Sequence, residues 1–99
     1  MCGRYYIDDD TIREMEKLVR QIDKKLLEEK SRDVFPSQNA PAVTGRDGVL
    51  CGEELVWGFP GFEKSRVIFN ARQETALEKR TFRDSLLLRR CVIPAKNFY

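Results

Sequence analysis

The stretch Ala42-Val43-Thr44-Gly45-Arg46-Asp47-Gly48-Val49-Leu50-Cys51 holds two short apolar runs on either side of a turn that contains Gly and Asp. Apolar runs joined in this way are typical of a β-hairpin, because Gly and Asp tolerate the left-handed backbone of tight turns. Further strands are expected over residues 3–7, 54–57, 66–69 and 91–93, where β-branched and aromatic residues gather. The sequence therefore predicts a hairpin over residues 42–51 and several short strands around it.

A single amphipathic helix is expected before the hairpin, over residues 11–27. Its apolar residues recur at three- and four-residue spacing and form one stripe: Ile12, Met15, Val19, Ile22 and Leu26. The opposite face is charged, and the charged run over residues 28–33 ends the helix. A stripe of this kind is typical of a helix that packs onto the core of a small domain.

Three aspartates, Asp8-Asp9-Asp10, precede this helix. Three adjacent carboxylates cannot all face one ion from a regular element, whereas negative charge is favourable at a helix N-terminus. Thr11 and Glu14 also have the spacing of a capping box. The run therefore indicates helix capping, and we expect no metal site.

The second half of the chain predicts loops and short helices between its strands. Residues 34–41 contain two prolines, and a loop of fixed shape is expected there. A short helix is expected over residues 73–80 and another over residues 81–88. Strands and helices in this mixture predict an α+β domain.

Two features between residues 57 and 70 each allow two interpretations. Trp57, Phe59 and Phe62 are interleaved with Gly and Pro, which excludes the interior of a helix. Their rings either fill the core from a tight loop or stand exposed as a stacking platform for bases. Asn70 directly follows apolar strand residues, so its side chain either projects into a cleft or caps the following helix.

The composition is that of an ordinary soluble globular domain, with 41% hydrophobic and 34% charged residues in a chain of 99. No apolar run approaches the roughly 20 residues that cross a bilayer, and no leader sequence begins the chain, so we expect no membrane contact and a cytoplasmic setting. The cysteines Cys2, Cys51 and Cys91 do not form a disulfide or zinc pattern. The absence of histidine excludes Cys-His and Ser-His-Asp catalysis by this chain alone, and no cofactor is expected.

Charge is distributed unevenly along the chain, although the net charge is only +2. Residues 64–99 carry nine basic and three acidic side chains, and most of the basic ones are arginines. Arginine favours bidentate contact with phosphate or carboxylate. Nucleic acid is therefore a permitted partner, although a charge bias of this size is more often a solvated surface.

The N-terminus carries the candidate with the most specific chemistry. Removal of Met1 would leave Cys2 with its α-amine and its thiol on neighbouring carbons. The ordinary pKa values of these groups, about 7.7–8.0 and about 8.5, leave both partly reactive near neutral pH. A 1,2-aminothiol condenses with an aldehyde to an imine, and the thiol then closes a thiazolidine ring. The alternative is that Cys2 is simply a residue of the first strand.

The chain resembles one known family in five motifs that occur in the same order. The motifs are Met1-Cys2-Gly3-Arg4-Tyr5, Pro36-Ser37-Gln38-Asn39-Ala40-Pro41, Trp57-Gly58-Phe59-Pro60, Phe69-Asn70-Ala71-Arg72-Gln73-Glu74-Thr75 and Arg89-Arg90-Cys91-Val92-Ile93-Pro94-Ala95 with the following Phe98-Tyr99. The family is the SRAP family of SOS-response-associated peptidases, or abasic-site processing proteins. The resemblance implies an α+β fold around a curved, mostly antiparallel, partial β-barrel-like sheet. It further implies that residues 1–99 are the N-terminal portion of a single SRAP domain, cut before its C-terminal half.

The resemblance also implies a function and site residues. Members bind abasic sites in single-stranded DNA and form a thiazolidine DNA–protein crosslink, which would make the protein nucleoid-associated. Cys2 matches the nucleophile, and Asn70 matches the asparagine that helps to hold the sugar remnant and the cysteine amine. The residues that match DNA contacts are Arg4 and Arg72 for phosphate, and Trp57 and Pro36 for the bases that flank the lesion. A cysteine-nucleophile peptidase that acts on itself or on others, and a non-catalytic binding module, remain as alternatives.

The family pattern continues beyond the last residue of this chain. A glutamate follows the Phe-Tyr pair in the family, and a histidine lies further on; both assist ring opening and proton transfer. Because Tyr99 is the last residue here, we expect crosslinking by these 99 residues to be impaired. A partial core would also leave an exposed apolar edge, through which self-association is expected.

Overall fold

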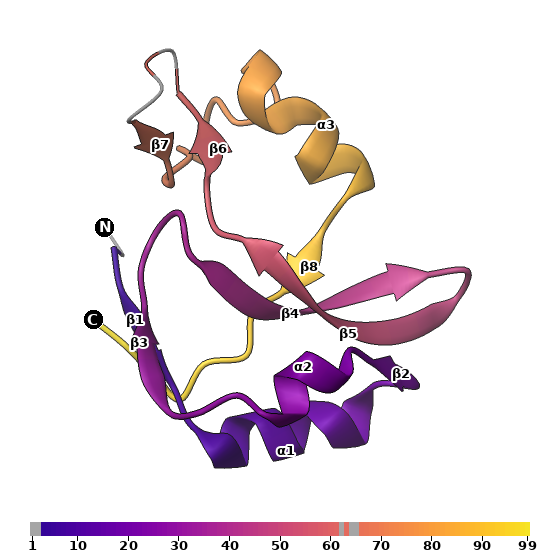
Figure 1. Cartoon of the computed structure of the whole chain (residues 1–99). Helices are drawn as coiled ribbons and strands as arrows, with labels where there is room; N and C mark the ends of the chain where they lie inside the picture. The colour runs from indigo at the N-terminus through magenta and orange to yellow at the C-terminus, as the bar shows by residue number, and fades with distance from the viewer. Residues whose placement is uncertain (1–2, 62, 64–65) are drawn as a thin grey trace.

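The computed structural model describes residues 3–61, 63 and 66–99. It confirms an α+β fold, with mostly antiparallel strands and helices on both sides of the central hairpin (Figure 1). The strands of this part of the chain form three sheets, ordered β3-β1-β9, β2-β5-β4-β8 and β6-β7, and these sheets are not closed into a barrel. The resemblance implied one curved sheet that is partly barrel-like, whereas the described strands form three open sheets.

The predicted hairpin is confirmed and is the longest paired segment of the fold. Strand β4 (Asn39–Arg46) pairs with β5 (Val49–Val56) along its whole length, from Asn39↔Val56 to Arg46↔Val49. The two turn residues, Asp47 and Gly48, have φ angles of 51° and 80°. Positive φ at both positions is the geometry of a type I′ turn, whose twist matches that of the strands. The separate strand expected over residues 54–57 is the end of β5.

The expected proline loop is shorter than residues 34–41, because β4 already begins at Asn39 and contains Pro41. A proline cannot donate a ladder hydrogen bond, so it is tolerated only where its nitrogen faces no partner strand. Strand β8 (Cys91–Val92) pairs with β4 only at Val43 and Thr44. Pro41 lies outside this short pairing, which explains how it fits in a strand at the middle of the sheet.

The single helix expected over residues 11–27 is wrong, because the structure breaks it in two. Helix α1 (Asp9–Leu18) is followed by strand β2 (Gln21–Ile22) and helix α2 (Lys24–Leu27). Strand β2 lies parallel to β5, and the backbone amides of Arg20 and Asp23 donate to the carbonyls of Leu50 and Gly52 at 2.8 and 2.9 Å. Pairing with the hairpin edge satisfies backbone groups that a continuous helix would have satisfied internally.

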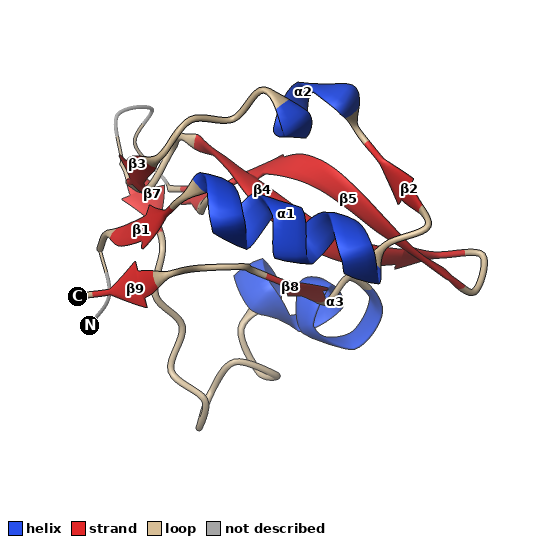
Figure 2. Cartoon of the chain, turned by 90° about the horizontal axis from the view of Figure 1, so that it is seen from below, coloured by secondary structure: helices blue, strands red, loops and turns tan. Residues whose placement is uncertain are grey.

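The apolar stripe of this segment nevertheless packs on the core as predicted. Ile12, Met15 and Leu26 are buried, and Val19 and Ile22 pack partly buried against the same cluster. The two helices lie beneath the hairpin in Figure 1, and the view from below shows α1 running across β4 and β5 (Figure 2). A glycine permits this close approach, because a Cβ on Gly52 would lie 3.1 Å from Ile22 Cγ1 and 3.2 Å from Met15 Cε.

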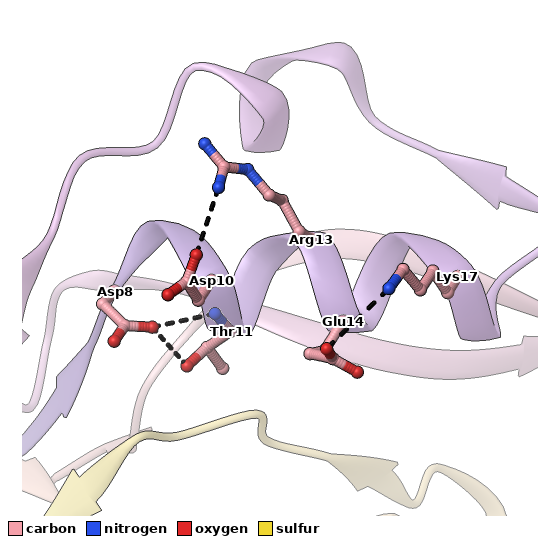
Figure 3. Close-up of polar contacts among 6 residues, drawn as sticks. All are labelled: Asp8, Asp10, Thr11, Arg13, Glu14 and Lys17. Carbon is pink, nitrogen blue, oxygen red and sulfur yellow. Dashed lines mark hydrogen bonds and ion pairs between the residues drawn. The ribbon is translucent and has the colours of Figure 1, made fainter.

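The predicted helix cap is present, but Asp8 rather than Thr11 is the capping residue. The Asp8 carboxylate accepts hydrogen bonds from the backbone amide of Thr11 at 2.8 Å and from its hydroxyl at 2.6 Å (Figure 3). Farther along α1, Arg13 pairs with Asp10, and Lys17 pairs with Glu14. The aspartate run therefore begins a helix, and among the described residues no group of three or more side chains could hold a metal ion.

The Asp8 cap predicts a pH dependence of stability. Hydrogen bonds from the Thr11 hydroxyl and amide lower the pKa of Asp8. A carboxyl with a lowered folded-state pKa stabilises the fold above its unfolded pKa of about 3.9 and loses this contribution as pH falls through the folded-state pKa. Asparagine also caps helices but does not titrate. Thermal unfolding should therefore show a wild-type advantage over Asp8→Asn at pH 7 that shrinks by pH 3, and a constant difference would contradict this role.

A second sheet closes the core on the side of the N-terminal strand. Strand β1 (Tyr5–Ile7) pairs antiparallel with β3 (Arg32–Val34) on one edge and with β9 (Asn97–Phe98) on the other. The buried core cluster comprises Tyr5, Ile7, Ile12, Met15, Leu26, Val34, Ala40 and Val43. The first strand is therefore held on both edges, and its inward side chains are anchored in the core.

The last third of the chain departs further from the prediction. Residues 73–78 form turns rather than the helix expected over 73–80, whereas α3 (Arg80–Leu88) confirms the helix expected over 81–88. Helix α3 lies on the opposite side of the hairpin from α1 (Figures 1 and 2). Large apolar side chains remain exposed along this region: Leu87, Leu88, Val92, Ile93 and Phe98. No helix of the described residues is long and apolar enough to cross a membrane.

Candidate functional site near the N-terminal segment

Trp57 lies at the centre of the candidate site. Its half-buried indole packs between Tyr5, with ring centroids 5.6 Å apart, and Phe69, in an edge-to-face pair with centroids 6.3 Å apart. It also borders the core cluster. The side chain therefore combines features of both interpretations, because one part packs on the core and another part stays open to solvent. Phe59 packs edge-to-face on Phe82 of α3, and Phe62 lies outside the described residues.

The backbone of Trp57 is fixed by the turn that contains Pro36. The amide of Ser37 donates to the carbonyl of Trp57 at 2.8 Å, and the amide of Trp57 donates to the carbonyl of Gln38 at 3.0 Å. Ser37 has a φ of 74°, and the Gln38 amide closes the turn on the Phe35 carbonyl at 3.2 Å. This combination describes a type II turn with proline at its first central position. The structure thus brings Pro36 and Trp57 together, although they are far apart in sequence.

Trp57 lines two clefts. One cleft, of about 750 Å³, opens between the hairpin and α3. Its lining includes Tyr5, Trp57 and Phe59 together with Arg46, Arg89 and Arg90. A second cleft, of about 480 Å³, is lined by Ser37, Trp57 and Pro60 among others. Because Trp57 belongs to the lining of both clefts, a group bound in either of them would lie beside it.

The N-terminal segment lies close to the segment that carries Asn70. A Cβ placed on Gly3 would lie 3.7 Å from Phe69 Cε2, so the Phe69 ring is the nearest group on that side of Gly3. Gly3 is covalently bonded to Cys2, and Phe69 to Asn70. Met1 and Cys2 lie outside the described residues, and Asn70 is exposed. The two chain segments that carry the predicted catalytic residues are therefore neighbours.

The chain bends at Gly58, directly after Trp57. Gly58 has a φ of +106°, and a Cβ on it would lie 2.2 Å from Val67 Cγ1. Immediately after it, β6 (Phe59–Pro60) pairs antiparallel with β7 (Val67–Ile68), with Phe59 opposite Ile68. Only glycine combines this backbone conformation with so close an approach. The pairing places the end of β7, and therefore Phe69, beside the indole of Trp57.

Arg4 lies beside an acidic and an aromatic side chain. Its guanidinium is 3.9 Å from the Tyr99 ring centroid and 3.9 Å from Asp33 Oδ2. The Tyr99 hydroxyl donates a hydrogen bond to Asp33 Oδ1 at 3.2 Å. The three residues come from the three strands or strand ends of the β3-β1-β9 sheet. Stacking on an aromatic ring orients a guanidinium while its charge stays accessible to solvent.

Arg72 lies in the turn that follows Asn70, and its side chain is exposed. The amide of Thr75 donates to the Arg72 carbonyl at 3.2 Å, which fixes the backbone of this turn. The helix that Asn70 was expected to cap is not formed, since α3 begins at Arg80 and has Lys79 as its N-cap. The interpretation of Asn70 as a helix cap is therefore wrong, and the alternative that it projects into a cleft stays a prediction, since Asn70 is exposed and outside the lining of both clefts.

The two cysteines of the described part of the chain have no feature of activated thiols. Cys51 is buried in β5. Burial raises the pKa of Cys91, and the nearby negative charge of Glu53 raises it further. Burial likewise raises the pKa of Tyr5 to about 12, so that its phenol stays protonated near neutral pH. None of these groups is therefore suited to act as a nucleophile or a base at pH 7.

Sequence reasoning assigned no role to Phe69, Asp33 or Tyr99. Phe69 belongs to the same family motif as Asn70. Its position next to a predicted site residue is the sequence signal that could have identified it. The grouping of Asp33 and Tyr99 around Arg4 depends on the pairing of β1 with β3 and β9. No local sequence pattern specifies such pairings, because they join residues that are distant along the chain.

The fold and this arrangement define an α+β protein in which Tyr5 of the first strand lines a cleft between the hairpin and α3. The family described as SOS response associated peptidase (SRAP) matches residues 1–99, and the chain belongs to this family. It is 37% identical to the abasic site processing protein YoaM and 36% identical to the abasic site processing protein YoqW, both of Bacillus subtilis strain 168. The matches cover 100% of this chain but 46% and 47% of those relatives. The chain thus spans about half of their length. No solved structure gives a significant match.

Proposed function

We propose that this chain captures abasic sites in single-stranded DNA through a covalent thiazolidine at Cys2, after removal of Met1. Membership of the SRAP family and the names of the abasic site processing relatives support the substrate. The observation that carries the proposal is the short distance between Gly3 and the Phe69 ring, because these residues directly follow Cys2 and directly precede Asn70. The role is one in the response to DNA damage.

The chemistry requires only an aldehyde and the two nucleophiles of an N-terminal cysteine. The ring-opened form of an abasic site provides the aldehyde carbon. The Cys2 amine adds to this carbon, and loss of water gives an imine. The thiol sulfur then adds to the same carbon while the thiol proton passes to the nitrogen, so that a five-membered ring closes without an external oxidant or reductant. In this proposal the Asn70 amide holds the sugar remnant and the amine in place by hydrogen bonds.

The walls of the site are suited to a strand that lacks one base. Trp57 lines both clefts, and its backbone is hydrogen-bonded to the turn that contains Pro36. A ring at this position can stack on a neighbouring base in place of the missing one. An abasic position also costs less to unstack than an intact nucleotide, which favours the lesion over undamaged DNA. Trp57 and Pro36 are therefore proposed to wedge against the bases on either side of the lesion.

The test compares three single strands of the same sequence with the Met1-free chain. One strand contains an abasic site, the second contains a tetrahydrofuran analogue that cannot open to an aldehyde, and the third is undamaged. Intact mass spectrometry first establishes that Met1 has been removed. A shifted band on a denaturing gel is expected for the abasic strand alone, and equal bands or no band for all three strands would overturn the proposal.

Binding of the DNA backbone should depend on Arg72. Each basic side chain that neutralises one phosphate of a single strand contributes about 0.7 to the slope of log affinity against log salt concentration. Arg72→Ala is therefore expected to weaken binding of undamaged single-stranded DNA and to reduce this slope by about 0.7. Fluorescence anisotropy at several salt concentrations measures both quantities.

Arg13→Ala is the matched control for this measurement. Arg13 is an exposed arginine on α1 that pairs with Asp10. Its replacement removes the same charge from a different side of the fold and should leave the slope unchanged. An equal loss of slope in both variants would show that net charge, rather than Arg72, determines the binding.

A further inference from the structure

One aromatic side chain joins the two segments that the proposed reaction must bring together. The Phe69 ring lies beside Gly3, 3.7 Å from the position that a Cβ on Gly3 would occupy, and it is edge-to-face with Trp57. Trp57 in turn packs on Tyr5, which belongs to the same N-terminal segment as Gly3. These neighbours therefore form a closed circuit that runs from Gly3 through Phe69 and Trp57 to Tyr5 and back along the chain.

Each member of this circuit is held by a different part of the fold. Tyr5 is buried in β1, a strand paired on both edges. Trp57 is fixed through its backbone by the Ser37 turn. Phe69 follows β7, whose pairing with β6 depends on Gly58. The backbone that carries the Phe69 ring is therefore fixed by the β6-β7 pairing, although 39% of the residue is exposed.

Gly3 itself has less support from regular structure. It precedes β1, which begins at Tyr5, so that the ladder bonds of the sheet do not include it. Chain ends outside secondary structure are usually poorly ordered unless a packing contact ties them down. The Phe69 ring is the group placed to provide such packing, and Gly3 lies one residue from Cys2 in the sequence.

We propose that Phe69 is a positioning residue that orders the N-terminal segment against the segment of Asn70. This inference rests on the proposed function, because it concerns the rate at which the Cys2 amine and thiol reach a bound aldehyde. Phe69 neither donates nor accepts a proton in the reaction. A misplacement of about 1 Å can cost about 10²-fold in rate, and a smaller side chain at position 69 would permit such a movement.

The expected result separates the rate of crosslinking from the affinity for DNA. Phe69→Leu should lower the first-order rate of crosslinking at saturating abasic DNA by about 10- to 100-fold. The dissociation constant for undamaged single-stranded DNA should change by less than about twofold, because Phe69 carries no charge for the phosphates. Phe69→Tyr keeps the ring and should retain the rate of the wild type.

Phe82→Leu is the matched control. Phe82 forms an edge-to-face pair with Phe59, with ring centroids 5.4 Å apart, at a different place in the fold. Its replacement removes an aromatic pair of the same type and should leave the rate of crosslinking close to that of the wild type. An equal loss of rate in Phe69→Leu and Phe82→Leu would overturn the positioning role, and so would an equal loss of rate and affinity in Phe69→Leu.

A second measurement tests the positioning role even if the wild type forms no crosslink. The order parameter of the Gly3 amide, measured by ¹⁵N relaxation, should be close to about 0.85 in the wild type and below about 0.6 in Phe69→Leu. Failure of crosslinking in the wild type with this change in Gly3 would overturn the proposed function and leave the positioning role in place. An unchanged Gly3 order parameter in Phe69→Leu would overturn the positioning role whatever the outcome of the crosslinking assay.

Discussion

A Cys2→Ser variant is expected to form no stable crosslink with abasic single-stranded DNA under conditions in which the wild type does. Serine keeps the α-amine, so an imine with the aldehyde still forms and breaks reversibly. A hydroxyl is a far weaker nucleophile than a thiol near neutral pH, and the ring does not close. The imine then hydrolyses on a denaturing gel. The measurement is the fraction of DNA in the shifted band after equal incubation.

In the same experiment, borohydride distinguishes the role of the Cys2 amine from that of the Cys2 thiol. Hydride reduces an imine to a stable amine, so borohydride present during incubation should restore a crosslinked band for Cys2→Ser. Cys91→Ser is the matched control, because Cys91 is a second free cysteine that lines the larger cleft. It should crosslink like the wild type. A strong band for Cys2→Ser without borohydride, or a lost band for Cys91→Ser, would contradict the assignment of Cys2.

The Gly58→Val variant is expected to lose a large part of the stability of the fold. Valine is strained at a φ of +106°, and its Cβ would lie 2.2 Å from Val67 Cγ1. Strain at such a φ costs about 1–3 kcal/mol, and overpacking costs about as much again. A loss of about 3–5 kcal/mol is a large share of the roughly 5–15 kcal/mol that stabilises a small domain. Urea unfolding followed by circular dichroism measures the loss.

Gly45→Val controls for the intrinsic effect of replacing a glycine in this part of the chain. Gly45 lies in β4, and no atom lies within 4 Å of the position that its Cβ would occupy. A β-branched residue suits a strand, so this variant should be at least as stable as the wild type. If Gly58→Val and Gly45→Val unfolded at the same urea concentration, the tight contact at Val67 would not be a constraint on the fold.

The local parts of the fold were predictable from sequence, and the long-range parts were not. The Asp47-Gly48 turn and the apolar stripe from Ile12 to Leu26 are local patterns, and both have the predicted roles. The break between α1 and α2 is not a local property. The residues around β2 continue the helical pattern, and only the free edge of β5 offers their backbone a better set of partners. Tertiary pairing therefore overrides helix propensity in this segment.

The candidate site likewise has one part that sequence motifs predict and another part that depends on long-range pairing. Family motifs indicated Pro36, Trp57 and Asn70 one at a time, and the structure adds the contacts between their segments. The Trp57 backbone is hydrogen-bonded to the Pro36 turn, and the Phe69 ring lies beside Gly3. These contacts depend on the β6-β7 pairing and on the conformation of Gly58, neither of which follows from a motif. Cys2 is outside the described residues, so its role remains a prediction.

The pairing of β1 with β9 has a consequence for how the protein is made. Tyr5 lies opposite Phe98, so the first strand gains its second neighbour only after almost all of the 99 residues have been synthesised. Contacts between residues this distant along the chain form late in folding, because closing a long loop is entropically costly. During translation β1 is therefore paired with β3 before it can pair with β9. The edge of β1 that β9 covers stays open until residues 97–98 have been synthesised, so this edge is the last part of the β3-β1-β9 sheet to form.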